Sequence, residues 1–346
     1  MGEIKVIVTD DSGLMRLIIA DIINEADDMK VVDTAFDGKD CVEKALKQEV
    51  DVIVLDMTMG EYDGLYAIKN ILEKKKVPIL ILSAMGNTNM DPIMEALKLG
   101  AIDYLNKPEK NRAKVREISA QIIKKVREVA KSNRITIAPV KEVKANTLNH
   151  TFDSPLSYDL IAIGASTGGP TAVEAVVSKL PGNLPVPVII AQHMPANFIP
   201  SYAKRLDNIS PLEVLIGRKD DRVEAGKIVI ASGSRNTFLR RNELGHVVID
   251  FTQEKYKEFN YPSIDCLMLS VAEVYGARSI AAILTGMGKD GALGMEAIYR
   301  KGGYTLAQDE ATSVVYGMPR AIKERGLSKA DLPISQMAGF MVSCLS

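Results

Sequence analysis

Ser166 lies in a glycine-rich segment whose residue types suit either a nucleophile or a phosphate-binding turn. The segment reads Gly164-Ala165-Ser166-Thr167-Gly168-Gly169-Pro170 and follows the apolar run 160–163. This pattern predicts a strand-to-helix turn, which exposes the serine hydroxyl at the end of a sheet beside free backbone N–H groups. Both kinds of site fit that geometry, so other residues must decide between them.

Two more polar residues follow apolar runs in the same half of the chain. His193 comes after 187–192, and Asp290 comes shortly after 279–284. Because the carboxyl ends of parallel strands share one sheet edge, we expect Ser166, His193 and Asp290 to meet there. An imidazole can take the serine proton, and a carboxylate can orient the imidazole. Taken alone, His193 would be a structural histidine and Asp290 a helix cap.

A dinucleotide-binding turn is the main alternative for the glycine-rich segment. Its fingerprint needs Gly-x-Gly-x-x-Gly and an acidic residue at the end of the next strand. Here Ser166 replaces the second glycine, and the next strand ends in Gln192-His193 without an acid. The sequence therefore favours acyl transfer, with backbone N–H groups of 167–169 and 286–288 expected to stabilise an oxyanion.

Composition limits the class of protein without defining its chemistry. The 346 residues are 47% hydrophobic, which is enough for two domains, and the net charge of -1 predicts neither nucleic acid nor an anionic membrane as a partner. Three scattered cysteines predict neither a disulfide framework nor a zinc cluster. Without a signal-peptide pattern or a membrane-length apolar run, we expect a cytoplasmic protein with no direct membrane insertion.

The first 120 residues alternate short apolar runs with amphipathic stretches. This alternation predicts a doubly wound parallel α/β sheet of five strands. The expected strands are 5–9, 31–35, 50–55, 78–82 and 101–105, and the expected helices are 13–26, 38–47, 64–74 and 91–99.

Polar residues end the strands of this first sheet. Asp10 and Asp11 follow the first strand, Asp56 the third, and Ser83 the fourth, while the fifth leads to Lys107. Three carboxylates at one edge repel one another unless a hard cation binds them, so we expect a Mg²⁺ site. The metal and Lys107 would offset the charge of an incoming phosphoryl group, which leaves Asp56 as its acceptor.

These residues identify a resemblance to a known domain. Residues 3–121 resemble the receiver domain of two-component response regulators, in which the residue matching Asp56 is phosphorylated. The resemblance also implies a cis peptide bond between Lys107 and Pro108. It implies that the metal is held by Asp10, Asp11, Asp56 and the Thr58 carbonyl, that Ser83 and Tyr104 form the switch, and that Lys107 binds the phosphate.

The loop after Asp56 departs from the closest relatives of this kind. Thr58 and Gly60 stand where a glutamate and a proline are usual. Glycine should loosen the loop, so we expect an effect on the lifetime of the phosphate.

A basic, helical pattern follows over 111–130, and 132–158 has no sustained periodicity. We interpret the basic residues as a solvated helix face. Residues 122–154 are therefore predicted to be a helix end and an interdomain linker.

Residues 155–346 resemble the catalytic domain of the chemotaxis protein-glutamate methylesterases. The predicted fold is doubly wound and mainly parallel. Six segments carry the resemblance: 164–170, Gln192-His193-Met194-Pro195, Pro262-Ser263-Ile264-Asp265, 284–292, Ala307-Gln308-Asp309-Glu310 and Val315-Tyr316-Gly317-Met318-Pro319.

This second resemblance implies an activity and a regulation. Ser166, His193 and Asp290 match the catalytic triad, Met287 matches the oxyanion donor, and Thr167 would orient the nucleophile. The implied reaction is hydrolysis of glutamate methyl esters, with deamidation of glutamines, on methylated chemoreceptors; no cofactor is needed. A chemotaxis histidine kinase would phosphorylate the receiver, which would otherwise cover the catalytic edge. The alternative is a response regulator whose second domain binds a partner without catalysis.

Several positions depart from the methylesterase pattern. Ser232 and Asn236 replace a usual proline and histidine, and Asn260-Tyr261 replace a histidine-arginine pair. We expect these residues to flank the substrate cleft and to affect receptor choice or reaction rate.

Overall fold

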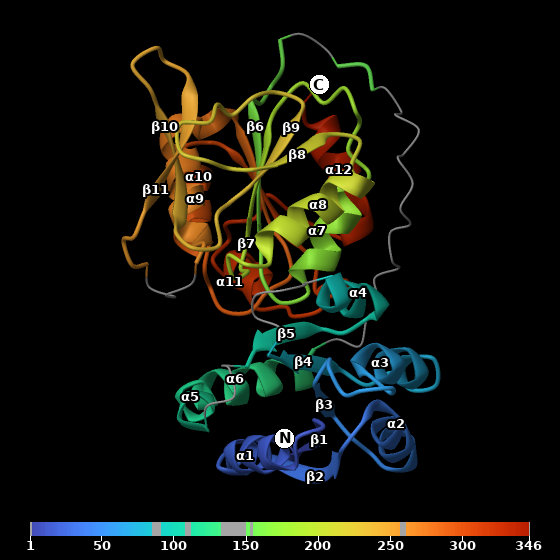
Figure 1. Cartoon of the computed structure of the whole chain (residues 1–346). Helices are drawn as coiled ribbons and strands as arrows, with labels where there is room; N and C mark the ends of the chain where they lie inside the picture. Colours follow the sequence, from blue (N-terminus) through green and yellow to red (C-terminus); the bar gives the residue numbers. More distant parts are fainter. Residues whose placement is uncertain are drawn as a thin grey trace. The chain divides into compact units, whose positions relative to one another are not determined.

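The computed structural model describes residues 2–84, 91–107, 112–132, 150–152, 155–256 and 261–345. The chain divides into two compact units, Met1–Thr136 and Ile137–Ser346 (Figure 1). The Lys107-Pro108 peptide, Asn260 and most of the predicted linker lie outside the described residues.

The first unit has a five-stranded parallel sheet with the order β2-β1-β3-β4-β5, which confirms the predicted fold. Its elements are β1 (Ile4–Thr9), α1 (Gly13–Asn24), β2 (Met29–Ala35), α2 (Gly38–Lys47), β3 (Val52–Leu55), α3 (Gly64–Leu72), β4 (Ile79–Ser83), α4 (Asp91–Leu99), β5 (Asp103–Asn106), α5 (Arg112–Glu117) and α6 (Ser119–Ala130). The predicted basic helix is thus two helices, which are separated at Ile118.

The first three helices of this unit each begin at an N-cap residue whose side chain accepts a backbone hydrogen bond. Ser12 accepts a hydrogen bond from the N–H of Met15, and the corresponding caps of α2 and α3 are Asp37 and Asp63. Helices α1 and α6 pack their apolar faces on β1, β3 and β4, and this layer forms the core on one face of the sheet.

The second unit has a seven-stranded parallel sheet with the order β14-β13-β12-β6-β7-β9-β8, and a separate antiparallel hairpin, β10-β11. A mainly parallel α/β domain was predicted and is confirmed. Its elements are β6 (Leu160–Ala165), α7 (Gly169–Val177), β7 (Val188–Gln192), α8 (Ile199–Ile209), β8 (Glu213–Ile216), β9 (Lys227–Ile230), β10 (Asn236–Arg241), β11 (Val247–Thr252), α9 (Ile264–Val274), a 3₁₀ turn η1 (Gly276–Arg278), β12 (Ser279–Ile283), α10 (Ala292–Arg300), β13 (Tyr304–Gln308), α11 (Met318–Glu324), β14 (Ala330–Leu332) and α12 (Ile334–Ser343).

Helices cover both faces of this second sheet. Helices α9, α10 and α11 pack on one face over a core that includes Ile264, Met268 and Met295, and α7, α8 and α12 lie on the other (Figure 1). None of the helices within the described residues has the length and apolar character needed to span a membrane.

Candidate functional site

The three central strands of the second sheet deliver the predicted triad. Strands β12, β6 and β7 are neighbours, and all three run in the same direction. Ser166 directly follows β6, His193 directly follows β7, and Asp290 lies in the loop after β12. The sheet therefore brings together residues that are 27 and 97 positions apart in the sequence.

A chain of two hydrogen bonds joins these residues. His193 Nδ1 lies 3.0 Å from Ser166 Oγ, and His193 Nε2 lies 2.7 Å from Asp290 Oδ2. An ionised carboxylate only accepts hydrogen bonds, so the imidazole proton belongs on Nε2. Nδ1 then carries the free lone pair and accepts the hydrogen bond from the serine hydroxyl.

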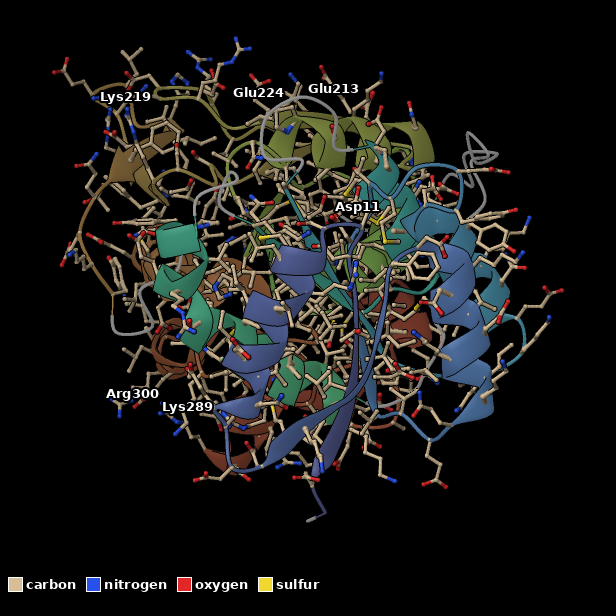
Figure 2. All side chains as sticks on the ribbon, turned by 60° about the horizontal axis from the view of Figure 1, so that its bottom comes forward. Asp11, Glu213, Lys219, Glu224, Lys289 and Arg300 are labelled. Carbon is tan, nitrogen blue, oxygen red and sulfur yellow. The ribbon has the colours of Figure 1, made fainter. Side chains whose placement is uncertain are left out.

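Asp290 is buried and held at both oxygens. Its Oδ1 accepts hydrogen bonds from the N–H groups of Asp265 (2.9 Å) and Gly291 (3.0 Å), and its Oδ2 accepts one from the N–H of Ile264 (2.8 Å). Burial alone would raise the pKa of Asp290, but the hydrogen bonds from His193 and from these N–H groups outweigh burial and lower it. Asp290 is therefore ionised at neutral pH. The side chain of the preceding residue, Lys289, points outward (Figure 2).

Hydrogen bonds to backbone groups of Ser166 and Gly169 fix the turn after β6. The N–H of Ser166 donates to the carbonyl of Thr285 (3.1 Å), and the N–H of Gly169 donates to the carbonyl of Ser166 (2.7 Å). Gln192 Nε2 also donates to the Ser166 carbonyl, at 2.9 Å. Ser166 as a whole residue is only 8% exposed, so most of its surface is enclosed at the sheet edge.

The loop after β12 lies beside this turn. Thr285 Oγ1 donates to the Thr167 carbonyl (3.0 Å), and the Thr285 N–H donates to Gln308 Oε1 (2.7 Å). The N–H of Gly286 donates to the Val315 carbonyl, so it is not free for an oxyanion. For the Met287 N–H, in contrast, no backbone acceptor is found among the described residues.

Two of the positions that depart from the family pattern have different surroundings. Asn236 is only 1% exposed; its Nδ2 donates to the Glu254 carbonyl, and its Oδ1 accepts the Ser263 N–H at 2.6 Å. Asn236 therefore stabilises the segment that begins α9, and it is too buried to contact a substrate. Tyr261, in contrast, is 38% exposed.

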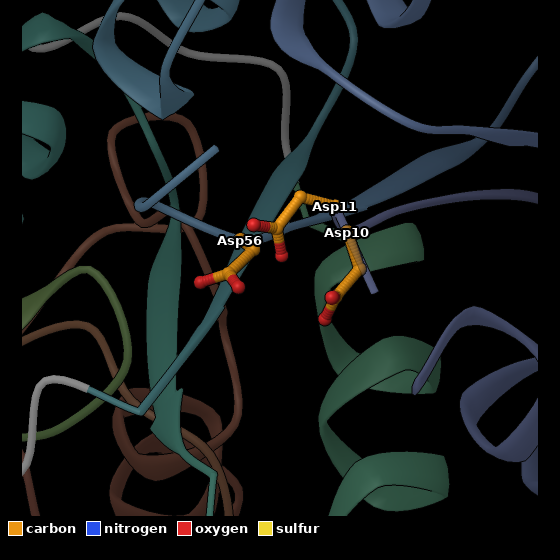
Figure 3. A group of neighbouring side chains, drawn as sticks. All are labelled: Asp10, Asp11 and Asp56. Atoms are coloured by element: carbon orange, nitrogen blue, oxygen red, sulfur yellow. The ribbon is translucent and has the colours of Figure 1, made fainter. Parts of the chain in front are cut away.

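The first unit gathers three carboxylates at the ends of β1 and β3. One oxygen from each of Asp10, Asp11 and Asp56 lies within 4.8 Å of the others (Figure 3). Carboxylate oxygens are the ligands that Mg²⁺ prefers, and three negative charges need a cation. The donor set of this receiver domain therefore fits a Mg²⁺ site.

Lys107 lies buried beside this group. Its Nζ contacts Asp56 Oδ2 at 2.6 Å and also contacts Asp10 Oδ2. Burial raises the pKa of Asp56, and Lys107 opposes that shift. The ammonium thus lies next to the carboxylate that is predicted to accept a phosphoryl group.

The remaining residues of the predicted receiver site lie on β4, on β5 and in the loop after β3. Ser83 ends β4 and is buried, Tyr104 lies in β5 and is buried, and Thr58 is exposed in the loop after β3. Gly60 has φ +74°, which a proline, fixed near −65°, cannot adopt. Glycine at this position therefore changes the shape of the loop and not only its flexibility.

Sequence reasoning missed the residues that hold the catalytic groups. Ser263, Asp265 and Gln308 were recognised only as parts of family segments, with no role. Ser263 before an apolar helical run was a recognisable cap signal, and its Oγ accepts the N–H of Cys266 at 3.2 Å. Nothing in the sequence reveals that Ser263 Oγ also donates to Asp290, at 3.2 Å.

Comparisons with known proteins agree along the whole chain. The CheB methylesterase family model matches residues 161–341, and the response regulator receiver domain model matches residues 6–119. The protein-glutamate methylesterase/protein-glutamine glutaminase of Archaeoglobus fulgidus is 37% identical over 345 residues, which is 99% of this chain and 98% of the relative. Protein-glutamate methylesterase/protein-glutamine glutaminase 2 of Carboxydothermus hydrogenoformans is 39% identical over 350 residues, which covers 99% of each chain.

A solved structure matches the second unit. The crystal structure of the Thermotoga maritima CheB methylesterase catalytic domain has a TM-score of 0.53 and 34% identity, and the match covers 55% of this chain and 100% of that domain. With the two family models and the full-length relatives, this match assigns the chain to the CheB-type protein-glutamate methylesterase/protein-glutamine glutaminase family, with an N-terminal receiver domain and a C-terminal methylesterase domain.

Proposed function

We propose that Ser166, His193 and Asp290 hydrolyse glutamate methyl esters, and deamidate glutamines, on methyl-accepting chemoreceptors. One observation carries the proposal: the continuous hydrogen-bond chain from Ser166 Oγ through the His193 ring to Asp290. A serine hydroxyl without an adjacent base is a poor nucleophile at neutral pH, and this chain supplies both the base and the group that orients it.

In the acylation half-reaction Ser166 Oγ attacks the side-chain carbonyl carbon, and His193 Nδ1 takes the hydroxyl proton. The carbonyl π electrons move to oxygen, and the developing oxyanion is stabilised by the Met287 N–H and by the turn at Thr167. As the intermediate collapses, the C–O bond to the methoxy group breaks. The same proton passes from Nδ1 to the leaving oxygen, and methanol departs; from a glutamine the leaving group is ammonia.

In the second half-reaction water replaces the serine. His193 Nδ1 removes a proton from the water, whose oxygen attacks the acyl carbon. Collapse breaks the ester bond to Ser166, and the proton returns to Oγ. The products are a receptor glutamate and free enzyme. Asp290 stays ionised throughout and stabilises the imidazolium that forms in each half-reaction.

The receiver domain is proposed to accept a phosphoryl group at Asp56 from a chemotaxis histidine kinase. Asp10, Asp11, Asp56 and the Thr58 carbonyl would hold Mg²⁺, which when bound offsets the charge of the transferring group. Lys107, which already contacts Asp56 Oδ2 at 2.6 Å, would then bind a phosphoryl oxygen. Ser83 and Tyr104 would change conformation when Asp56 is phosphorylated, and this change in the receiver domain would relieve its inhibition of the methylesterase domain.

Variants at two serines test the nucleophile assignment. Ser166→Ala should reduce methanol release from methylated receptor membranes on the order of 10⁴-fold or more, because the attacking oxygen is gone. Ser335→Ala, at an exposed serine of α12, is the matched control and should keep the wild-type rate. Wild-type release by Ser166→Ala would remove Ser166 from the mechanism.

A further inference from the structure

The first turns of α9 and α10 each bind a carboxylate that belongs to the other helix or to the residues just before it. Asp290, just before α10, accepts the N–H groups of Ile264 and Asp265 at the start of α9. In return, Oδ1 of Asp265 accepts the N–H groups of Leu293 (2.8 Å) and Gly294 (2.9 Å) at the start of α10. Each helix thus binds the carboxylate that the other supplies, and one of those carboxylates belongs to the triad.

Asp265 is not needed to cap its own helix. The N-cap of α9 is Ser263, whose Oγ accepts the N–H of Cys266. The N-cap of α10 is Gly291, which has no side chain to offer, so the first turn of α10 depends on Asp265 from the neighbouring helix. Asp265 is 4% exposed, and water cannot easily replace it there.

The two helices have little room to adjust. A Cβ on Gly294 would lie 2.2 Å from Met268 Cβ, and one on Gly291 would lie 2.8 Å from Ile264 Cγ2. A change in the first turn of α10 is therefore transmitted to the loop that holds Asp290, two residues before that helix starts.

We infer that Asp265 is a positioning residue for the reaction: by binding the first N–H groups of α10, it keeps the Asp290 carboxylate where Nε2 of His193 meets it. The inference rests on the proposed function of the triad. Asp265 touches neither substrate nor a reacting atom in this role.

The negative charge of Asp265 should also affect how the reaction rate depends on pH. Two buried carboxylates, Asp265 and Asp290, lie near one another, and burial followed by this repulsion raises the pKa of Asp265 to about 6. Within the part of the chain that the structure describes, the titratable groups found near the pair include His193, which contacts Asp290, and Tyr256, Cys266 and Glu254. Removing the Asp265 charge should make protonation of the His193–Asp290 pair less favourable and shift the acid limb of the pH profile to lower pH.

Two substitutions separate position from charge. Asp265→Ala removes both the acceptor and the charge, whereas Asp265→Asn keeps an oxygen for the two N–H groups and removes only the charge. Asp207→Ala is the matched control, since Asp207 Oδ1 also accepts one backbone N–H, that of Val214 at 2.9 Å, and it links α8 to β8.

The measurement is methanol release by the full-length chain, with kcat expressed per site titrated by a serine-directed fluorophosphonate. Asp265→Ala should lower kcat on the order of 10–100-fold with KM unchanged, because the catalytic geometry is displaced. Asp265→Asn should lose much less kcat and shift the acid limb of kcat/KM to lower pH. Asp207→Ala should change neither property.

The inference is overturned if Asp265→Ala has the wild-type kcat per titrated site, or if Asp265→Asn, which keeps the acceptor oxygen, loses as much kcat as Asp265→Ala. Should Asp265→Ala fail to fold, Asp265→Glu takes its place, since it keeps the charge but displaces the acceptor oxygens by one methylene; a wild-type kcat per titrated site in that variant overturns the inference. Ser166→Ala, whose release is expressed per mole of chain because it has no nucleophile to titrate, tests the proposed function separately. Continued release there rejects the triad, whereas inactive Ser166→Ala with unaltered Asp265 variants rejects only the role of Asp265.

Discussion

His193 presents its two ring nitrogens in the reverse of the arrangement in chymotrypsin-type triads. There Nε2 receives the serine proton and Nδ1–H meets the carboxylate. Here Nδ1 faces Ser166, and Nε2 faces Asp290. The backbone of His193 is fixed at the sheet edge, since its N–H donates to the Ala165 carbonyl at 3.0 Å. The chemistry is the same, but the proton must be on the other nitrogen.

This geometry predicts the tautomer of the resting enzyme. In ¹⁵N-histidine-labelled protein at a pH where the ring is neutral, His193 should show a protonated Nε2 and an unprotonated Nδ1. The chain has three histidines, so the signal can be assigned by its loss in His193→Gln. A protonated Nδ1 would mean that Ser166 has no base in this arrangement.

Asp290→Asn should disturb that tautomer. The asparagine amide can offer an N–H to Nε2, which drives the ring proton to Nδ1 and removes the lone pair that faces Ser166. We expect kcat for methanol release to fall about 10⁴-fold with little change in KM, as a wrong tautomer does in a serine-protease triad. A loss of less than tenfold would show that Asp290 does not set the tautomer.

Asp265 should also affect how stability depends on pH. Its folded-state pKa of about 6 lies above the ordinary 3.8, so the native state binds this proton more tightly. Asp265 therefore favours the fold as pH falls from 7 to 4, and this contribution is lost as pH rises through about 6. Two pH units correspond to about 3 kcal/mol in free energy of unfolding.

Asp265→Asn should remove this dependence. Relative to wild type, the variant should raise the Tm of the methylesterase domain by several degrees at pH 8 and by about a third as much at pH 4.5, as measured by calorimetry. Comparing the two proteins at each pH cancels the effects of other titrating groups. A Tm difference that does not change between these pH values would contradict the assigned protonation.

At this scale the sequence predicts the residue types but not their contacts. Ser166, His193 and Asp290 follow from strand ends, because parallel strands share an edge. Which imidazole nitrogen faces the serine depends on ring orientation, which no spacing encodes. Asn236 was expected near the substrate, but its burial against Ser263 depends on the packing of β10 with α9.

At the scale of elements, α9 and α10 position the carboxylate of the triad. Asp290, if only a helix cap, would cap α10, but the structure shows it binding the first turn of α9. Sequence patterns describe caps within one helix and cannot describe an exchange between two helices. The helix-cap interpretation of Asp290 and its place in the triad are thus compatible, because the same carboxylate stabilises the start of a helix and accepts a hydrogen bond from His193.

Gly294→Ala should test the close packing of these helices. Its Cβ would lie 2.2 Å from Met268 Cβ, so the helices must separate, at a cost of about 1–3 kcal/mol. We expect a lower Tm for the methylesterase domain together with a lower kcat.

Gly339→Ala in α12 is the control for helix propensity. Nothing lies within 4 Å of a Cβ placed there, so alanine should stabilise the helix by about 0.5–1 kcal/mol and leave kcat unchanged. If Gly294→Ala behaves like Gly339→Ala, the two helices are not packed as tightly as described.

Most boundaries of the elements could be predicted, because apolar runs and caps are local. Helices 38–47 and 91–99 agree with α2 and α4, and the first strand differs from the prediction by one residue. The helical pattern predicted over 111–130 corresponds to α5 and α6, but composition alone does not mark the break at Ile118.

At the scale of the whole molecule, the chain joins a receiver domain to a methylesterase domain. Each has a parallel sheet, and the residue that we propose to react follows a strand of it, Asp56 after β3 and Ser166 after β6. The two family models cover these units in turn. We propose that phosphorylation of the first regulates the second, and this coupling can be measured only in the full-length chain.

Methanol release from methylated receptor membranes, with and without a small-molecule phosphodonor and Mg²⁺, measures both the activity proposed for Ser166 and the regulation proposed for Asp56. Wild type should be stimulated, Asp56→Asn should keep its basal rate without stimulation, and Ser166→Ala should release almost no methanol under either condition. Continued release by Ser166→Ala, or full stimulation of Asp56→Asn, would contradict the account of a serine esterase controlled through Asp56.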